Sequence, residues 1–523
     1  MKKLVLGAAV SAAMFGGVAQ AAITLDAGKP VITPANTYEV YLSGSSAVGP
    51  FIESLFTSKK VPAANQVCDT KKSMYKFQDT STGGKDQVAY LCELNQSNTA
   101  LSGLSAGKTN LLIYKRHNGG SAQGVSPIVA NSAIDFLKVD NAANCALSGS
   151  VVAAGAGFTK FNCTYTAGNT ELSNKQIPDF GVSDVDPIQF RGDNTPTGYA
   201  EVTAADVSNL VVKAAATQVF GVAVSTNLRN AMQEAVFGKT NVCATNAKTR
   251  ETAACMPSLN SAQIASIFTG QLSSWKQLKL GGTTDVFTGA SVQPGSDRLH
   301  ICRRASGSGT QAQLAIKFMG YPCNDIAPKG IADTAATPEL VDKAQVHAMT
   351  SAGAMSECLA ELSSGSDTVG TSFVNTYGAR WAIGMQGTEL NASLSSDWRF
   401  IKIDGEEPTL DKVARGKYKD WVELTYQYNK AHVFDESEQQ IVDEIIKQSG
   451  NPVVLAATNA LSAVHTWGAA GYLATPQSFK ANEAGLYGSG SPVNPFSHGT
   501  TTASTNNCRL PALYDPKGGI QLK

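Results

Sequence analysis

Residues 303–310, with the sequence Arg-Arg-Ala-Ser-Gly-Ser-Gly-Thr, restrict the fold of this chain more than any other segment. The run before them, 299–302, alternates like a strand, and 311–318 is suited to a helix. The N–H groups at a helix start carry partial positive charge, and small residues let an anion approach the backbone closely. A strand, a Gly/Ser turn with an arginine at its edge, and a helix therefore predict a site for a tetrahedral oxyanion. Linkers have similar compositions, so one such turn is not sufficient evidence.

Three more segments have related patterns. A predicted strand at 38–42 leads into the turn Ser43–Ser46 and a helix at 48–56, with Pro50 in its first turn. A buried strand at 111–114 leads into a second small-residue turn at 118–125. The run 178–184 predicts a strand that ends at Asp184. Because ligands of α/β sheets bind beyond the carboxyl ends of strands, these turns and Asp184 are expected to meet.

Strands alternating with helices predict an α/β fold with largely parallel sheets. The β-rich run 218–224 is expected to cross between two lobes, and Asn260 is expected to cap a helix at 261–268 that Gly270 ends. An amphipathic helix is predicted at 437–448, with Ser437 and Gln440 as its capping box. The sequence also predicts two insertions, at about 59–110 and 132–176, strand and turn structure at 368–382, and a mostly irregular loop at 485–507.

The N-terminus has the pattern of a signal peptide. Lys2 and Lys3 precede a stretch of apolar and small residues at 4–18, and Ala19–Ala21 fits a cleavage site, so the mature chain is expected to start at Ala22. No later run reaches the roughly 20 apolar residues that span a bilayer. We expect a periplasmic or secreted protein that does not insert into a membrane. The balanced charge, with 42 basic and 42 acidic residues, gives no sign of nucleic-acid binding.

The ten cysteines fit an oxidising compartment. The simplest guess pairs neighbours in the sequence: Cys68 with Cys92, Cys145 with Cys163, and Cys243 with Cys255. Cys302 with Cys323 and Cys358 with Cys508 then remain, although sequence cannot fix connectivity. The six histidines are dispersed and no zinc spacing appears, so no metal or cofactor is expected. No Gly-x-Ser-x-Gly hydrolase elbow is present, and 103–109 is one residue short of a nucleotide P-loop.

Six segments, in order between about residues 38 and 430, resemble one protein family: the periplasmic phosphate-binding proteins of ABC transporters, the PstS-like branch of the two-lobed, type II substrate-binding proteins. They are the two small-residue loops at 43–50 and 119–125, Asp179–Asp184 (D-F-G-V-S-D), 259–270 with Trp275, 303–310, and 403–408 with 416–418. The resemblance implies two lobes with a hinge and an anion cleft between them. We expect residues 22–218 to form the first lobe, 219–382 the second, and 383–523 to return to the first and extend beyond it.

The resemblance also implies the binding residues. Arg304 would donate bidentate hydrogen bonds and Asp184 would accept one. Hydroxyl groups and backbone N–H groups would complete the shell around the anion. The implied phosphate site contains Ser46, Ala47, Val48, Ser121, Asp184, Arg304, Ser308, Gly309 and Thr310.

Two positions depart from the family pattern. The family's first-loop hydroxyl aligns with Ala47 or Val48, for which Ser45 or Ser46 could substitute. The family's aspartate beside the binding arginine is Ser306 here, which removes a charge that would orient Arg304. Outside the resemblance, Ser308 and Thr310 could simply cap a helix.

The expected function is non-catalytic capture of inorganic phosphate, or a related oxyanion, by a monomer that serves an ABC permease. One alternative is a secreted phosphatase on the same scaffold, which would need a nucleophile or metal in the cleft. Another is a secreted structural or surface-assembly protein that retains the binding fold, which the cysteines and insertions leave open.

Overall fold

A computed structural model describes residues 23–46, 48–80, 87–104, 107–139, 144–332, 339–340, 342–367, 377–479, 487–500, 504–515 and 519–521. Several predictions fall wholly or partly outside these ranges: the signal peptide at 1–21, Ala47, residues 368–376 of the expected strand and turn at 368–382, and parts of the two insertions and of the expected loop at 485–507. A search of the described ranges finds no helix with the length and apolar character that a membrane span requires.

The fold is α/β, as predicted, and is built on one fourteen-stranded sheet. Its strands lie in the order β15 (Gln345–Met349), β14 (His300–Arg304), β16 (Ala382–Gly387), β12 (Leu210–Ser225), β19 (Trp421–Asn429), β11 (Phe180–Ser183), β3 (Thr37–Gly44), β6 (Asn110–Arg116), β5 (Gln87–Glu93), β4 (Met74–Asp79), β9 (Phe158–Cys163) and β8 (Cys145–Leu147). Strands β17 (Trp398–Phe400) and β22 (Tyr472–Ala474) also pair with β12.

The prediction of a largely parallel sheet is wrong, because the sheet is mixed. β11, β3 and β6 are parallel to one another, and β14 is parallel to β15 and β16. β12 pairs antiparallel with both β16 and β19, and β5 returns antiparallel between β6 and β4. Short connections favour antiparallel neighbours, whereas parallel neighbours need a crossover of a dozen residues or more.

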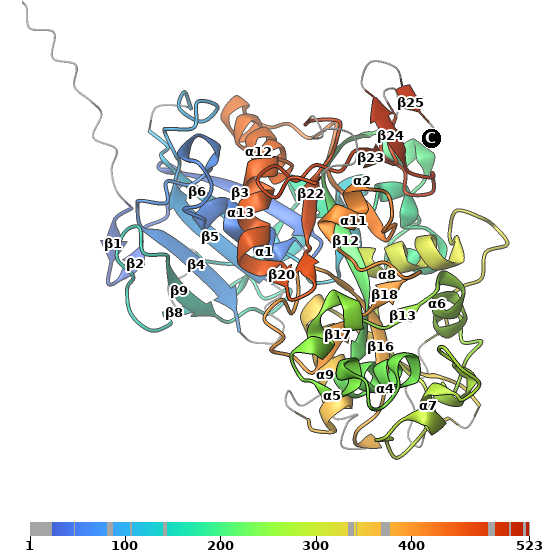
Figure 1. The fold of residues 1–523 in the computed structure, drawn as a ribbon. Coiled ribbons are helices and arrows are strands. Elements are labelled where there is room, and N and C mark those ends of the chain that lie inside the picture. The colour runs from blue at the N-terminus through green and yellow to red at the C-terminus, as the bar shows by residue number, and fades with distance from the viewer. Residues whose placement is uncertain are drawn as a thin grey trace, which may run out of the picture.

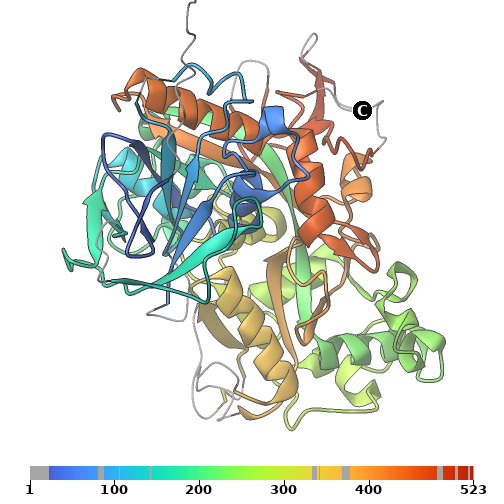
Figure 2. The same cartoon turned by 90° about the vertical axis from the view of Figure 1, so that its left-hand side faces the viewer.

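Strand β12 joins two lobes, as Figure 1 shows. Its first part pairs with β19, and its last part, Phe220–Val224, pairs with β16. We call the side with β11, β3 and β6 the first lobe and the side with β14, β15 and β16 the second lobe. The N-terminal strands and the helices α4 (Thr226–Phe237) and α5 (Val242–Thr245) lie at opposite ends of the molecule in both views (Figures 1 and 2). The predicted strand at 218–224 is confirmed, and the division of the chain into moving units stays a prediction.

The first lobe buries an apolar core beneath three helices, α1 (Gly49–Thr57), α12 (Glu436–Ser449) and α13 (Pro452–Ser462). The amphipathic face predicted for 437–448 is confirmed, because Ile441, Val442 and Ile445 are fully buried. The predicted cap at Ser437 is wrong. Asp435 caps the helix by accepting the N–H of Glu438, whose side chain returns to Asp435. Asp is as strong a cap as Ser, and acidic side chains are favoured in the first turn of a helix.

The two segments interpreted as insertions extend the sheet. Residues 59–110 contribute β4 and β5 to the sheet, and 132–176 contribute β8 and β9. The second segment also forms a separate antiparallel pair, β7 (Ile134–Leu137) with β10 (Ser173–Gln176). Phe77, Phe136 and Phe161 from these strands are almost completely buried in a separate core on the other sheet face.

The second lobe surrounds its own core with several helices. Besides α4 and α5 these are α6 (Ser261–Phe268), α7 (Val286–Gly289), α8 (Gly309–Leu314), a π-helix at Ala315–Met319 that continues α8, α9 (Ala352–Ser364) and α11 (Leu410–Ala414). Asn260 caps α6 in a capping box with Gln263, as predicted, and Gly270 with φ of 75° follows the end of α6. The remaining short elements are α2 (Ser126–Val129), α3 (Ala204–Ser208), β1 (Leu25–Asp26), β2 (Lys29–Pro30), β13 (Ser258–Leu259), β18 (Lys402–Ile403), β20 (Val464–His465), β21 (Gly468–Ala469), β23 (Phe496–Ser497), β24 (Ala512–Asp515) and β25 (Gly519–Gln521).

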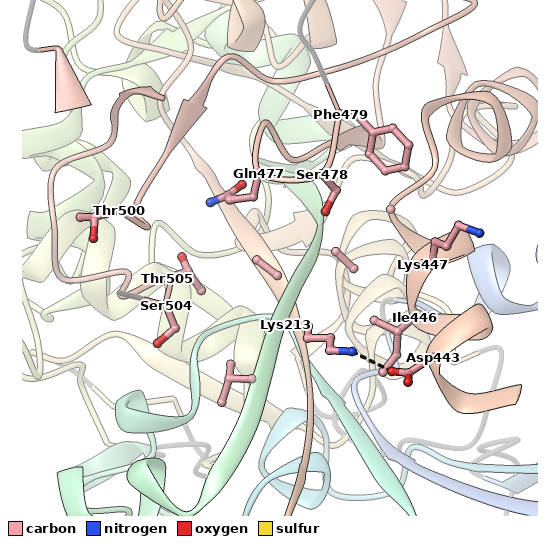
Figure 3. Close-up of a pocket in the computed structure, with 14 residues that line it drawn as sticks. Lys213, Asp443, Ile446, Lys447, Gln477, Ser478, Phe479, Thr500, Ser504 and Thr505 are labelled. Carbon is pink, nitrogen blue, oxygen red and sulfur yellow. Dashed lines mark hydrogen bonds and ion pairs between the residues drawn. The ribbon is translucent and has the colours of Figure 1, made fainter. Parts of the chain in front are cut away.

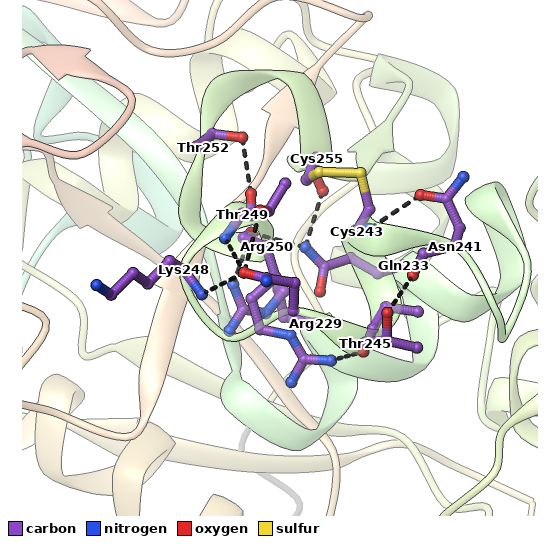
Figure 4. Close-up of a disulfide and its surroundings, with 12 residues drawn as sticks. Arg229, Gln233, Asn241, Cys243, Thr245, Lys248, Thr249, Arg250, Thr252 and Cys255 are labelled. Carbon is purple, nitrogen blue, oxygen red and sulfur yellow. Dashed lines mark hydrogen bonds between the residues drawn. A yellow bond between two sulfur atoms is a disulfide. The ribbon is translucent and has the colours of Figure 1, made fainter.

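All ten cysteines form disulfides. The three local pairs, Cys68–Cys92, Cys145–Cys163 and Cys243–Cys255, are confirmed. Figure 4 shows Cys243–Cys255, where Gln233 donates to the carbonyl oxygen of Cys255 at 2.8 Å.

The other two predicted pairs are wrong, because the structure joins Cys302 to Cys358 and Cys323 to Cys508. Cys302 lies on β14 and Cys358 on α9, in one small core. Cys508 joins Cys323. The residue before it, Asn507, exchanges hydrogen bonds of 2.7 and 2.8 Å with Asp186 and so holds this part of the chain in place. Packing between elements distant in the sequence therefore determines both pairs.

Candidate functional site

Three strand ends of the first lobe meet at one edge of the sheet. Because β11, β3 and β6 run parallel, the residues that follow them emerge on the same side. Ser45 follows β3, Ser121 begins a short 3-10 helix at Ser121–Gly124 after β6, and Asp184 follows β11. Gly181 allows the close approach of that 3-10 helix, because a Cβ atom there would overlap the carbonyl oxygen of Gly124.

The second lobe brings the turn between β14 and α8 onto this edge. The N–H of Ala122 donates to the carbonyl oxygen of Gly307 at 2.8 Å, so the small-residue turns of the two lobes are hydrogen-bonded to each other. Gly309 lies directly against Asp184, and a Cβ atom there would be 2.6 Å from the Cβ of Asp184. The predicted strand and helix around 303–310 are confirmed, and the turn faces the first lobe.

Asp184 is the centre of these contacts and is 2% exposed. The hydroxyl of Ser45 donates to its Oδ1, and that of Thr310 donates to Oδ2 at 3.5 Å. Its own N–H donates to the hydroxyl oxygen of Ser121 at 3.2 Å. Burial raises the pKa of Asp184, while the Ser45 hydrogen bond and the charges of Arg304 and Lys115 act in the opposite direction. Hydroxyl groups of both lobes therefore converge on one buried carboxyl.

Arg304 is 3% exposed at the end of β14. Its Nε donates to the carbonyl oxygen of Met349 at 3.3 Å, and Nη2 donates to that of Thr350 at 3.0 Å. These carbonyl groups, at the end of the neighbouring strand β15, orient the guanidinium. We expected that Ser306, in place of the family's aspartate, would remove a charge that orients Arg304. In the structure these carbonyl oxygens orient Arg304 instead.

The other predicted residues lie around this centre in different ways. Ser308 caps α8, since its hydroxyl oxygen accepts the N–H of Gln311 at 3.4 Å. Ser46 and Val48 lie in the loop before α1, and the described contacts do not join either of them to Asp184. Ala47, in the same loop, is outside the described residues. Ser45, considered as a substitute for the missing hydroxyl of that loop, is the residue that reaches Asp184.

Two buried ionisable groups near the site were not expected. Lys115, on β6, acts electrostatically on Asp184, and burial lowers its pKa to about 7. Glu389 follows β16, and burial raises its pKa to about 8 although Gln218 donates to it at 3.3 Å. Alternation along β6 was an available signal for Lys115, because it shares a strand face with Leu111 and Ile113. Glu389 lies in no motif that would have indicated it.

A separate cavity of about 510 Å³ lies between β12, α12 and the C-terminal segment (Figure 3). Lys213 and Asp443 form an ion pair of 2.7 Å at its wall, and both side chains are 43% exposed. Its lining includes none of the predicted site residues. A large cavity alone does not define a binding site, so we place the candidate site at Asp184.

No family model matches the chain, and no curated protein matches it. Similar solved structures include a Clostridium perfringens protein assigned as a phosphate ABC transporter substrate-binding protein, with bound phosphate (14% identity, 82% of this chain and 99% of that chain covered, TM-score 0.37). PstS from Borrelia burgdorferi is 12% identical, and the match covers 79% of this chain and 97% of that chain with a TM-score of 0.30. The high-affinity periplasmic phosphate-binding protein PfluDING, bound with phosphate, is 11% identical, and the match covers 82% of this chain and 91% of that chain with a TM-score of 0.37. These TM-scores are all below 0.5, so the function of this chain has to be inferred from its own site.

Proposed function

We propose that this chain captures inorganic phosphate, or a closely related tetrahedral oxyanion, between its two lobes without catalysing a reaction. The observation that carries the proposal is the buried carboxyl of Asp184, which hydroxyl groups from both lobes contact while the charge of Arg304 acts on it. Burial of charged and polar groups is unfavourable unless they are paired, so a concentration of them between lobes suits a polar ligand. The six segments that resemble phosphate-binding proteins support the same function.

The proposed roles follow from the donors and acceptors of each residue. Arg304 would donate to two oxygens of the anion, because a guanidinium matches such pairs in bidentate fashion. Ser121 and Thr310 would donate their hydroxyls, and the N–H groups at the start of α8 would add donors of partial positive charge. Ser46, Val48 and Ser308 belong to the same proposed shell, together with Ala47 and Gly309. The lobes would move apart to admit the anion and close around it.

Asp184 would provide the preference for phosphate over sulfate. An ionised carboxylate only accepts hydrogen bonds, and protonated phosphate supplies a proton whereas sulfate at neutral pH has none. Bound sulfate would leave Asp184 as a buried acceptor facing another anion. A site that hydrogen-bonds one ligand group discriminates strongly against ligands that lack it.

Calorimetric titration of the purified protein, freed of bound anion, tests this function. Phosphate and arsenate are expected to bind with micromolar or lower Kd, and sulfate roughly 10³-fold more weakly or not at all. A folded sample that binds none of the three anions would refute the proposal. Hydrolysis of a phosphate ester would favour the phosphatase alternative. Assembly into fibres without phosphate would favour the alternative of a structural or surface-assembly protein.

The proposal also specifies the compartment in which the chain acts and the protein to which it delivers phosphate. Export through the N-terminal segment 1–21 would bring the chain to the periplasm or the cell exterior, and the five disulfides fit an oxidising compartment. There a monomer would deliver phosphate to an ABC permease. The strands contributed by 59–110 and 132–176 enlarge the first lobe and could cover part of the surface that such a permease would contact.

A further inference from the structure

The disulfide between Cys323 and Cys508 differs from the other four in its exposure to solvent. Both of its cysteines are half-buried, whereas the cysteines of the other four disulfides are at most 7% exposed. A dithiol has to reach a sulfur atom to reduce a disulfide, so access decides which bond is cleaved first. In the folded protein, Cys323–Cys508 is therefore the disulfide that a reductant reaches most easily.

Cys323 is fixed to the second lobe. It lies just beyond the π-helix Ala315–Met319 that continues α8, and Met319 is buried in the core of this lobe. The N–H of Tyr321 donates to the carbonyl oxygen of Ala315 at 3.1 Å, so the chain before Cys323 turns back onto the π-helix. A movement of the second lobe therefore carries Cys323 with it.

Asn507, the residue before Cys508, is fixed to the first lobe. Its N–H donates to Oδ2 of Asp186 at 2.7 Å, and its side-chain oxygen accepts the N–H of Asp186 at 2.8 Å. Asp186 is 2% exposed and follows β11 closely. The carbonyl oxygen of Val185, between them, accepts the hydroxyl of Ser183 at the end of that strand at 2.5 Å. The first lobe therefore holds Asn507.

Adjacent residues of the C-terminal segment are thus attached to different lobes. Cα atoms joined by a trans peptide are about 3.8 Å apart, and the disulfide holds the Cα atoms of Cys508 and Cys323 5.3 Å apart. The Cα of Cys323 therefore stays within about 9 Å of that of Asn507. Opening of the lobes beyond this limit has to break the two hydrogen bonds between Asn507 and Asp186.

Non-covalent contacts cross the same boundary. Nη2 of Arg191 donates to the carbonyl oxygen of Pro322 at 2.9 Å, and the N–H of Asp193 donates to the hydroxyl of Tyr321 at 2.6 Å. The donors belong to the connection between β11 and β12, and the acceptors directly precede Cys323. The disulfide therefore lies at a place where the two lobes touch.

We infer that the Cys323–Cys508 disulfide is a reducible latch that limits the separation of the two lobes. The inference rests on the proposed function, because it concerns the lobe movement that admits and releases phosphate. Reduction transfers two electrons and two protons from a dithiol, which becomes a disulfide, to Cys323 and Cys508, which become thiols. Asn507 then stays with Asp186 while Cys323 moves with its lobe, so that the anion enters and leaves faster.

Release of radiolabelled phosphate during a chase with excess unlabelled phosphate measures this effect. The double variant Cys323→Ser/Cys508→Ser is expected to release phosphate roughly tenfold faster or more, because opening no longer breaks two hydrogen bonds at a buried carboxylate. Its Kd should change less than its release rate, because entry accelerates as well. The double variant Cys243→Ser/Cys255→Ser, which removes a buried disulfide of the second lobe (Figure 4), is the matched control and should release phosphate like the wild type.

Dithiothreitol tests the latch in the wild-type protein, which folds with the disulfide in place, even if the double variant does not fold. Mild treatment followed by alkylation and mass spectrometry is expected to label Cys323 and Cys508 before any other cysteine. Phosphate release from the labelled protein is expected to accelerate as in the double variant. Unchanged release after both cysteines are labelled, or earlier labelling of another pair, would overturn the inference.

Amide hydrogen exchange separates a failure of this inference from a failure of the proposed function. The N–H of Ala122 donates to the carbonyl oxygen of Gly307 across the two lobes, so its exchange reports their separation without any anion. Reduction is expected to accelerate this exchange in phosphate-free protein. Absence of phosphate binding by the folded wild-type protein would refute the proposed function, whereas unchanged exchange at Ala122 after reduction would refute the latch.

Discussion

Replacing Arg304 with methionine is expected to weaken phosphate binding about 100-fold or more, because losing one partner of a buried, hydrogen-bonded charge pair costs about 2–5 kcal/mol. Arg304 is held by the carbonyl oxygens of Met349 and Thr350, so its guanidinium is already oriented before an anion arrives. Calorimetric titration with phosphate measures the loss. Methionine retains much of the side-chain volume, which limits the effect on packing.

Arg303→Met is the matched control for this substitution. Arg303 precedes Arg304 on β14, and successive side chains of a strand point to opposite faces. Its loss should leave phosphate affinity within about twofold of the wild-type value. Equal affinity of the wild type and Arg304→Met would exclude Arg304 from the anion site.

Asp184→Asn is expected to abolish most of the selectivity of the site. The amide can donate a hydrogen bond to any oxyanion, so sulfate should gain affinity while phosphate loses the acceptor for its proton. We expect the preference for phosphate over sulfate to fall about 100-fold or more. Parallel titrations with the two anions measure this ratio. Asp179→Asn, at the other end of the same strand segment, should leave it unchanged.

The pH dependence of the wild-type protein provides the same test without a substitution. Burial raises the pKa of Asp184, so this carboxyl takes up its proton at a higher pH than an ordinary aspartate does. As the pH falls through that raised pKa, Asp184 becomes a donor and sulfate should bind more tightly. Sulfate binding that is independent of pH, together with unchanged selectivity in Asp184→Asn, would show that Asp184 does not select the anion.

Local patterns predicted the parts of the site that local residues determine. These parts are the strand, turn and helix at 38–56, the same succession at 299–318, and the strand that ends at Asp184. Each depends on apolar alternation, on small turn residues and on a helix start only a few residues away. Their convergence was expected from the general position of ligands in α/β sheets and from the resemblance. Contacts of Ser121, Gly309 and Thr310 with Asp184 agree with that expectation, although anion binding by these residues stays a proposal.

The features that sequence did not predict depend on distant segments. Lys115 contacts the loop after β3 because β6 lies beside β3, which brings its amine to the carbonyl oxygens of Gly44 and Ser45. Arg304 is oriented by carbonyl groups of β15 rather than by a neighbour in its own turn. The pairing of Cys323 with Cys508 spans 185 residues, a separation at which proximity in sequence gives no guidance.

The most direct test of the account is a crystal structure of the protein with one equivalent of arsenate, whose anomalous scattering locates the anion. The account predicts a single arsenic peak between the lobes, with its oxygens in hydrogen-bond contact with Arg304, Thr310 and Asp184. An arsenic peak elsewhere, or an ordered cleft at Asp184 without arsenate while the anion binds in solution, would contradict the assignment of this site.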